Sequence, residues 1–137
     1  MNTSTARRDL PGAPVQRSSS KPPLQAFFRI AALWQLSPEQ QMKLLGLQAP
    51  STFYNWRKSA PATLPRDTIE RISYVLGIYK ALQILIPDPR SADAWIKKPN
   101  RAPLFNGKSA LARMLTGNVS DLYVVRQYLD AHRGGWS

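Results

Sequence analysis

The feature that most constrains the fold is the stretch over residues 64–86, LPRDTIERISYVLGIYKALQILI. We predict one long helix here, because Pro65 suits a first helical position and Pro87 ends the segment. At 1.5 Å per residue, such a helix is a rod of about 30 Å. Residues 78–86 are apolar on nearly every side, so neighbouring helices or a second subunit must cover them. The first half is amphipathic, with a predicted apolar stripe of Ile69, Ile72, Val75, Leu76 and Tyr79.

The composition of the chain limits the kinds of partner it can have. Its 137 residues suffice for one domain, or for two small domains that share a core. It carries 19 basic and 8 acidic residues, and the net charge of +11 favours an anionic partner, nucleic acid first. A solvated basic surface is the alternative. Without cysteine there are no disulfides or thiolate metal sites, and without a long apolar run we expect a soluble, cytoplasmic protein that does not bind membranes.

Residues 1–23 are rich in proline and serine and poor in large apolar side chains. Such a segment buries too little surface to offset the entropy of ordering, so we predict a disordered arm. The arm is basic, and it can either track DNA phosphates or serve only as a solubilising tail. Its basic residues are Arg7, Arg8, Arg17 and Lys21.

A helix-turn-helix is predicted after a first helix over residues 25–35. Ser37 is a good N-cap for the next helix, and Gln40, three residues later, completes a capping box. Gly46 is expected to end that helix in the left-handed conformation. After a short turn, a further helix is expected to start at Pro50.

The second helix of this unit, PSTFYNWRK, has the chemistry needed to read DNA. Phe53 and Trp56 can face inward, which leaves the polar side chains outside. Asn55 can pair with adenine, and Arg57 can reach either phosphate or guanine. A helical hairpin with a polar outer face explains the same pattern without DNA binding. The candidate DNA-binding residues are Ser51, Thr52, Tyr54, Asn55, Arg57 and Lys58.

The rest of the chain is also predicted to be helical, without a convincing β-strand. Gly117 is expected to close a short helix, and Ser120 to cap the last one. The last helix shows one apolar stripe, formed by Leu122, Val125 and Leu129. These helices are predicted over residues 92–97, 108–115 and 121–132, after a turn at residues 87–91.

The sequence lacks the residue patterns of an enzyme. Its acidic residues are scattered singly, and it has no metal-ligand spacing and no glycine-rich phosphate loop. The single histidine, His132, is expected to interact with the C-terminal dipole of the last helix. We therefore predict no catalytic residues, no metal and no cofactor.

The last four residues, Gly134, Gly135, Trp136 and Ser137, form a second candidate site. A tryptophan behind two glycines is suited to insertion into a partner's pocket, since Trp is enriched at binding hot spots. A frayed end, or a tryptophan folded back on its own domain, explains the pattern equally well.

In order and spacing, the chain resembles the Xre/MbcA/ParS-type antitoxins that are paired with RES-domain toxins. The matching segments are WQLSPEQQMKLLGL (34–47), FYNWR (53–57), LPRDTIERISYVLGIYKALQILIPD (64–88), AWIKKPN (94–100) and LFNGKSALARMLTG (104–117). The resemblance covers roughly residues 25–133 and leaves out the basic arm.

The resemblance implies an all-α fold with two domains. A helix-turn-helix domain (24–62) would be joined by the long central helix to a small helical toxin-binding domain (63–137). The partner toxins resemble ADP-ribosyltransferases and degrade NAD, and the antitoxin's C-terminal end enters their active-site cleft. Such antitoxins are commonly homodimers and often repress their own operon. Carried over to this sequence, the toxin-blocking candidates are Tyr128, Arg133, Gly134, Gly135, Trp136 and Ser137.

We therefore predict an antitoxin that occludes the active site of a RES-domain toxin and binds operator DNA as a homodimer. In this interpretation Arg133 takes the place of the NAD pyrophosphate. Two rival hypotheses remain at this point. One is a helix-turn-helix transcription regulator without a toxin partner. The other is a toxin binder without DNA affinity, whose charge serves an acidic toxin surface.

Overall fold

The computed structural model describes residues 13–133, with side chains from Ser20 onward. Over this range the chain forms helices and no strand, apart from an isolated bridge between Pro99 and Ser109. None of the described helices is both long and apolar enough to cross a bilayer. The helices are α1 (Ala13–Leu33), α2 (Pro38–Leu45), α3 (Pro50–Lys58), α4 (Arg66–Leu85), α5 (Pro89–Ala94), the 3-10 helix η1 (Trp95–Lys97), α6 (Ala110–Met114) and α7 (Val119–Ala131).

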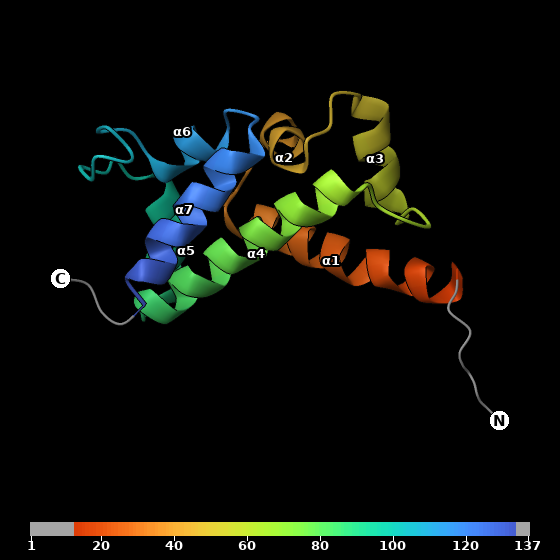
Figure 1. The fold of residues 1–137 in the computed structure, drawn as a ribbon, viewed down its shortest axis with the longest axis horizontal. Coiled ribbons are helices and arrows are strands. Elements are labelled where there is room, and N and C mark those ends of the chain that lie inside the picture. The colour runs from red at the N-terminus through yellow and green to blue at the C-terminus, as the bar shows by residue number, and fades with distance from the viewer. Residues whose placement is uncertain (1–12, 134–137) are drawn as a thin grey trace.

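Helix α4 is the common support of the molecule (Figure 1). Helix α1 crosses it on one side, and α7 packs along it on the other. Helices α2 and α3 lie toward its N-terminal end, and α5 lies near its C-terminal end. The predicted central helix is therefore confirmed, although it begins at Arg66 with Pro65 as the N-cap instead of the first helical residue.

The buried face of α4 differs from the predicted stripe. Ile69 is 51% exposed, whereas the neighbouring Thr68 is buried. The hydroxyl of Thr68 donates to the carbonyl oxygen of Leu45 at 3.5 Å, so a polar side chain is satisfied inside the fold. The second half is covered on most sides but not on all, since Ile84 remains 49% exposed. The buried residues of α4 are Thr68, Ile72, Val75, Ile78, Ala81 and Leu82.

Helix α1 starts earlier than the sequence suggested. The prediction of a disordered arm is wrong for residues 13–23, which belong to α1, while residues 1–12 lie outside the described part. One contact that holds this part of α1 comes from far along the chain: the hydroxyl of buried Ser20 donates to the carbonyl oxygen of Pro61 at 2.5 Å. Leu24 and Trp34 are buried farther along the same helix, at 2% and 1% exposure. Local composition does not report such long-range contacts.

Two helix starts in the C-terminal half also differ from prediction. The segment expected to be a turn begins α5, because the carboxylate of Asp88 accepts from the backbone N–H of Ser91 at 3.0 Å. Helix α7 begins at Val119 with Asn118 as N-cap, so Ser120 lies inside the helix instead of capping it. Gly117, just before this start, has a φ of 95°, a value that glycine adopts readily and that lets the chain turn into α7 ahead of Ser120.

Candidate functional site

The first helix of the helix-turn-helix is fixed at both ends by local contacts. The backbone N–H of Gln40 donates to the Ser37 hydroxyl at 3.1 Å, and the Ser37 N–H donates to the Gln40 amide oxygen at 2.9 Å. At the other end Gly46 has φ of 74°, in the left-handed region. The predicted capping box and glycine end are therefore confirmed. This arrangement fixes where the turn before α3 begins.

Helix α3 presents most of the candidate DNA-binding residues on an open face. Phe53 is its fully buried side chain, and Trp56 is half-buried, so the predicted inward pair is only partly inside. Four exposed residues recur at steps of three and four and form one stripe along the helix. Thr52 lies beside this stripe and is half-buried. The stripe, named the α3 stripe below, consists of Ser51, Tyr54, Asn55 and Lys58.

Arg57 points away from the α3 stripe, toward α1. Its guanidinium carbon lies 5.1 Å from the centre of the Phe28 ring and 6.0 Å from that of Phe53. Both distances suit a cation–π contact, which holds a planar cation against an aromatic face. The structure therefore places Arg57 off the α3 stripe.

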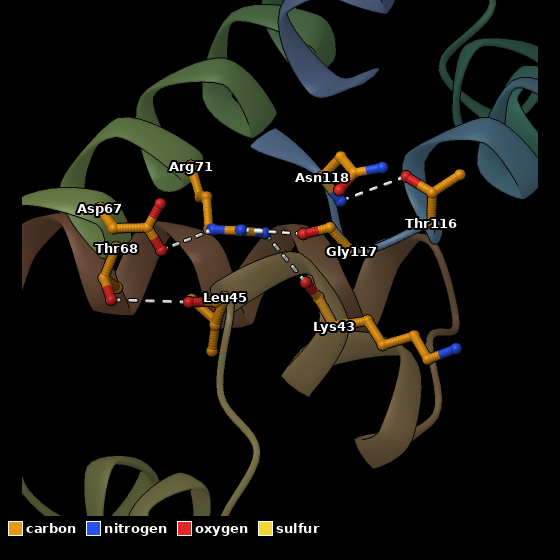
Figure 2. Close-up of polar contacts among 8 residues, drawn as sticks. All are labelled: Lys43, Leu45, Asp67, Thr68, Arg71, Thr116, Gly117 and Asn118. Carbon is orange, nitrogen blue, oxygen red and sulfur yellow. Dashed lines mark hydrogen bonds and ion pairs between the residues drawn. The ribbon is translucent and has the colours of Figure 1, made fainter. Parts of the chain in front are cut away.

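A second polar site, which sequence reasoning missed, joins the two halves of the molecule (Figure 2). The Arg71 side chain is 11% exposed, and its Nε lies 2.8 Å from the Asp67 carboxylate. Its terminal nitrogens donate to the carbonyl oxygens of Gly117 at 2.8 Å and Lys43 at 3.4 Å. One guanidinium thus links α4 to the end of α2 and to the turn between α6 and α7. The sequence around Arg71 carries no signal for this link, because the accepting carbonyls lie on other elements, 28 and 46 positions away.

Gly46 makes room for this link. A Cβ atom at position 46 would lie 2.7 Å from Nε of Arg71 and 2.9 Å from the Asp67 carboxylate. Its left-handed φ disfavours other residues independently of the available space. The glycine that ends α2 therefore also lets the Arg71 side chain pass close to the backbone.

An aromatic cluster lies at the C-terminal end of α7, where the predicted toxin-blocking segment begins. The ring of Tyr128 stacks with Trp95 at 6.4 Å between centroids and meets Phe105 edge-on at 5.2 Å. His132 follows at 4.5 Å from Tyr128, and its Nδ1 lies 2.8 Å from the Tyr128 carbonyl oxygen. Trp95 and Phe105 were not among the candidates, because no helical spacing connects them to Tyr128.

Of the remaining toxin-binding candidates, the structure describes Arg133 alone. The Arg133 side chain is 41% exposed and lies 3.7 Å from the carboxylate of Asp130. Gly134, Gly135, Trp136 and Ser137 lie outside the described residues. The structure thus places Tyr128 and Arg133 at the same end of α7.

The first turn of α7 carries a tightly bonded carboxylate. Asp121 accepts from the Thr116 hydroxyl at 2.5 Å and from Nε of Arg113 at 2.9 Å. The hydrogen bond from Thr116, followed by that from Arg113, lowers the pKa of Asp121 below its ordinary value. This network fixes the α6–α7 turn. In the described part of the chain, no three His, Cys, Asp or Glu side chains are grouped to hold a metal ion.

Comparisons with known proteins divide the chain into two parts. A model of the antitoxin Xre-like helix-turn-helix domain matches residues 13–77. A model of the antitoxin Xre/MbcA/ParS C-terminal toxin-binding domain matches residues 81–135. The uncharacterized protein y4oB of Sinorhizobium fredii is 56% identical over 112 residues, which cover 82% of this chain and 84% of that protein. The first match extends beyond the expected 24–62 on both sides, and each match includes part of α4.

Proposed function

The chain belongs to the Xre/MbcA/ParS antitoxins, and we propose that it neutralises a RES-domain, NAD-degrading toxin by placing its C-terminal segment in the toxin's active site. The observation that carries this proposal is the order of the two matches: a helix-turn-helix domain followed at once by a toxin-binding domain. The toxin-binding match includes the end of α7 and runs on to residue 135. The identity of the toxin and the way in which it is inhibited are the parts of this statement that we propose.

Charge and position support the role of the C-terminal segment. Arg133 is an exposed cation two residues after the end of α7. A guanidinium at the mouth of an NAD cleft can pair with acidic side chains of the toxin and so help to hold the segment where the pyrophosphate would lie. The aromatic cluster at Tyr128 gives this segment a packed base. The C-terminal segment would thus begin at a rigid, well-packed part of the fold.

The antitoxin is further proposed to bind its own promoter and repress it. The α3 stripe offers amide, hydroxyl and ammonium groups to a DNA groove, and the chain has a net charge of +11. We also propose a homodimer, since Ile69 and Ile84 of α4 leave apolar surface exposed, at 51% and 49%. Light scattering should give about twice the chain mass of 15.4 kDa. A monomer at micromolar concentration would contradict the dimer.

The decisive experiment removes residues 133–137. The shortened antitoxin should keep its helical circular dichroism, yet no longer preserve cellular NAD when co-expressed with the RES-domain toxin from the neighbouring reading frame. Deletion of residues 1–12 serves as the control and should leave NAD protected. If the variant without residues 133–137 still preserves NAD and still competes with it, the occlusion mechanism is wrong. If the full chain binds promoter DNA but no toxin co-purifies from its host, the rival transcription regulator is favoured.

A further inference from the structure

A basic hollow, named the α1–α3 cleft here, opens between α1 and the C-terminal end of α3. It has a volume of about 280 Å³. Three of its lining side chains are cationic, Lys21, Arg57 and Lys58, and none is acidic. The rest of the lining is Leu24, Gln25, Phe28, Trp56, Ser59 and Ala60. Charge complementarity therefore favours an anionic group in this cleft.

The charge of the surrounding segment points the same way. Glu39 is the one acidic residue between positions 13 and 65, and it lies on α2, outside the cleft lining. An anion in the α1–α3 cleft would therefore meet little repulsion from the helix-turn-helix half. The basic residues of this segment are Arg17, Lys21, Arg29, Lys43, Arg57 and Lys58.

Arg57 is already oriented for such an anion. Its guanidinium is held 5.1 Å from the Phe28 ring centre, and Phe28 itself lines the cleft. A stacked guanidinium loses less conformational entropy on binding than a free one, and its planar fork matches the oxygens of a phosphate. The contact with Phe28 thus favours a conformation in which Arg57 binds a phosphate at the cleft over one in which Arg57 extends to a base edge.

The position of the cleft identifies the source of the phosphate. Lys58 belongs both to the α3 stripe and to the cleft lining, so the two surfaces are continuous at the end of α3. With the stripe in a groove, a surface continuous with it would lie next to the sugar-phosphate strand that borders the groove. Figure 1 places this end of the molecule far from the C-terminal end of α7, so DNA and toxin can bind at separate sites.

We propose that the α1–α3 cleft binds a backbone phosphate of the operator, with Lys21, Arg57 and Lys58 as its ligands. Arg57 is then a positioning contact that reads no base. The inference rests on the proposed DNA binding and places Lys21, predicted only as part of a basic arm, at a defined phosphate site on helix α1. It also decides between phosphate and guanine, the two partners that the sequence left open for Arg57.

The test measures binding of the full chain to two duplexes of equal length, its own promoter and an unrelated sequence, over a range of salt. Lys21→Ala and Arg57→Ala should each weaken both complexes by the same factor and reduce the salt slope by about 1. Asn55→Ala should instead lower the preference for the promoter. Lys108→Ala removes an exposed lysine in the other half and should leave slope and preference unchanged. Thermal unfolding confirms that each variant is folded.

Three results would overturn the inference, and they are distinguishable. If Arg57→Ala reduces promoter preference as Asn55→Ala does, Arg57 reads a base. If Lys21→Ala and Arg57→Ala keep the wild-type salt slope, the cleft contacts no phosphate. Lost toxin affinity in these variants would then show that the cleft binds an acidic protein surface instead. If the wild-type chain binds neither duplex at low salt, the proposed DNA binding fails together with this inference.

Discussion

Helices α3 and α7 are both proposed to meet a partner, yet they are attached to the molecule in very different ways. Helix α7 packs along α4 through Leu122, Val125 and Leu129, which have no exposed surface. Helix α3 has one side chain buried to that extent, Phe53, and it lies at the edge of the fold (Figure 1). Elements with few buried apolar contacts open locally at low free energy. The proposed DNA-reading helix α3 is therefore attached to the core by few buried contacts, whereas α7, in the toxin-binding domain, is part of the core.

The largest effect is expected where α7 joins α4. Leu122→Ala should lower the free energy of unfolding by about 2–5 kcal/mol, because it leaves a cavity in the core. Both DNA binding and toxin neutralisation should decline, since α4 supports both halves. Urea titration measures the loss, and Gln127→Ala, an exposed position on the same helix, is the control. A stability loss below about 1 kcal/mol would contradict the account of α7.

A smaller and more local effect is expected at α3. A buried Phe→Ala change typically costs about 3–5 kcal/mol, but Phe53→Ala should cost less because α3 can detach while the remaining core stays packed. Promoter binding should be lost and toxin neutralisation kept. Amide hydrogen exchange should show protection lost over residues 50–58 only. Gln48→Ala, at an exposed position just before α3 and outside the α3 stripe, is the control. Loss of protection in α7 as well would show that the two helices are not independent.

Acid should weaken the α7 region and spare α3, which contains no acidic residue. Hydrogen bonds from Thr116 and Arg113 hold the pKa of Asp121 below the ordinary value of 3.8. A depressed pKa means that this contribution to stability is complete above about pH 3.8 and is lost as the pH falls through the lower pKa of the folded state. Hydrogen exchange in acid should show α7 loosening within this window. Asp121→Asn should remove this part of the pH dependence; an unchanged profile would contradict it.

The smallest expected effect is a gain in the stability of α3. Its N-cap is Ala49, with φ of −98° and ψ of 117°, and no side chain caps the helix. Ala49→Ser should supply that bond in a suitable backbone conformation and stabilise α3 by about 0.5–1 kcal/mol. Slower exchange of the α3 amides would report the gain, with Gln48→Ser as the control. If protection does not rise, fraying at this end does not limit the stability of α3.

The correctly predicted features have local causes. The capping of α2 by Ser37 and Gln40 and its end at Gly46 follow from neighbouring residues, and all three were read correctly. The exposed positions of α3 also followed from local spacing. The roles of these residues in DNA binding remain predictions.

The features that were missed depend on distant partners. Thr68 is buried because the Leu45 carbonyl accepts its hydroxyl, and Arg71 is held by carbonyls on two other elements. Neither partner can be identified from the periodicity of α4, which pointed to Ile69 instead. The same holds for α1, whose contact between Ser20 and Pro61 joins residues 41 positions apart. For Arg57, helix spacing showed exposure but not the Phe28 ring that redirects it.

The single guanidinium of Arg71 has a thermodynamic consequence for the cell. It donates to carbonyl oxygens at the end of α2 and in the α6–α7 turn, so a displacement of either segment would change a hydrogen bond of the side chain that also holds the other. By linkage, any factor by which toxin alters promoter affinity must equal the factor by which promoter alters toxin affinity. If the proposed toxin and promoter sites are coupled through Arg71, an operon that encodes both proteins would be transcribed according to the ratio of toxin to antitoxin.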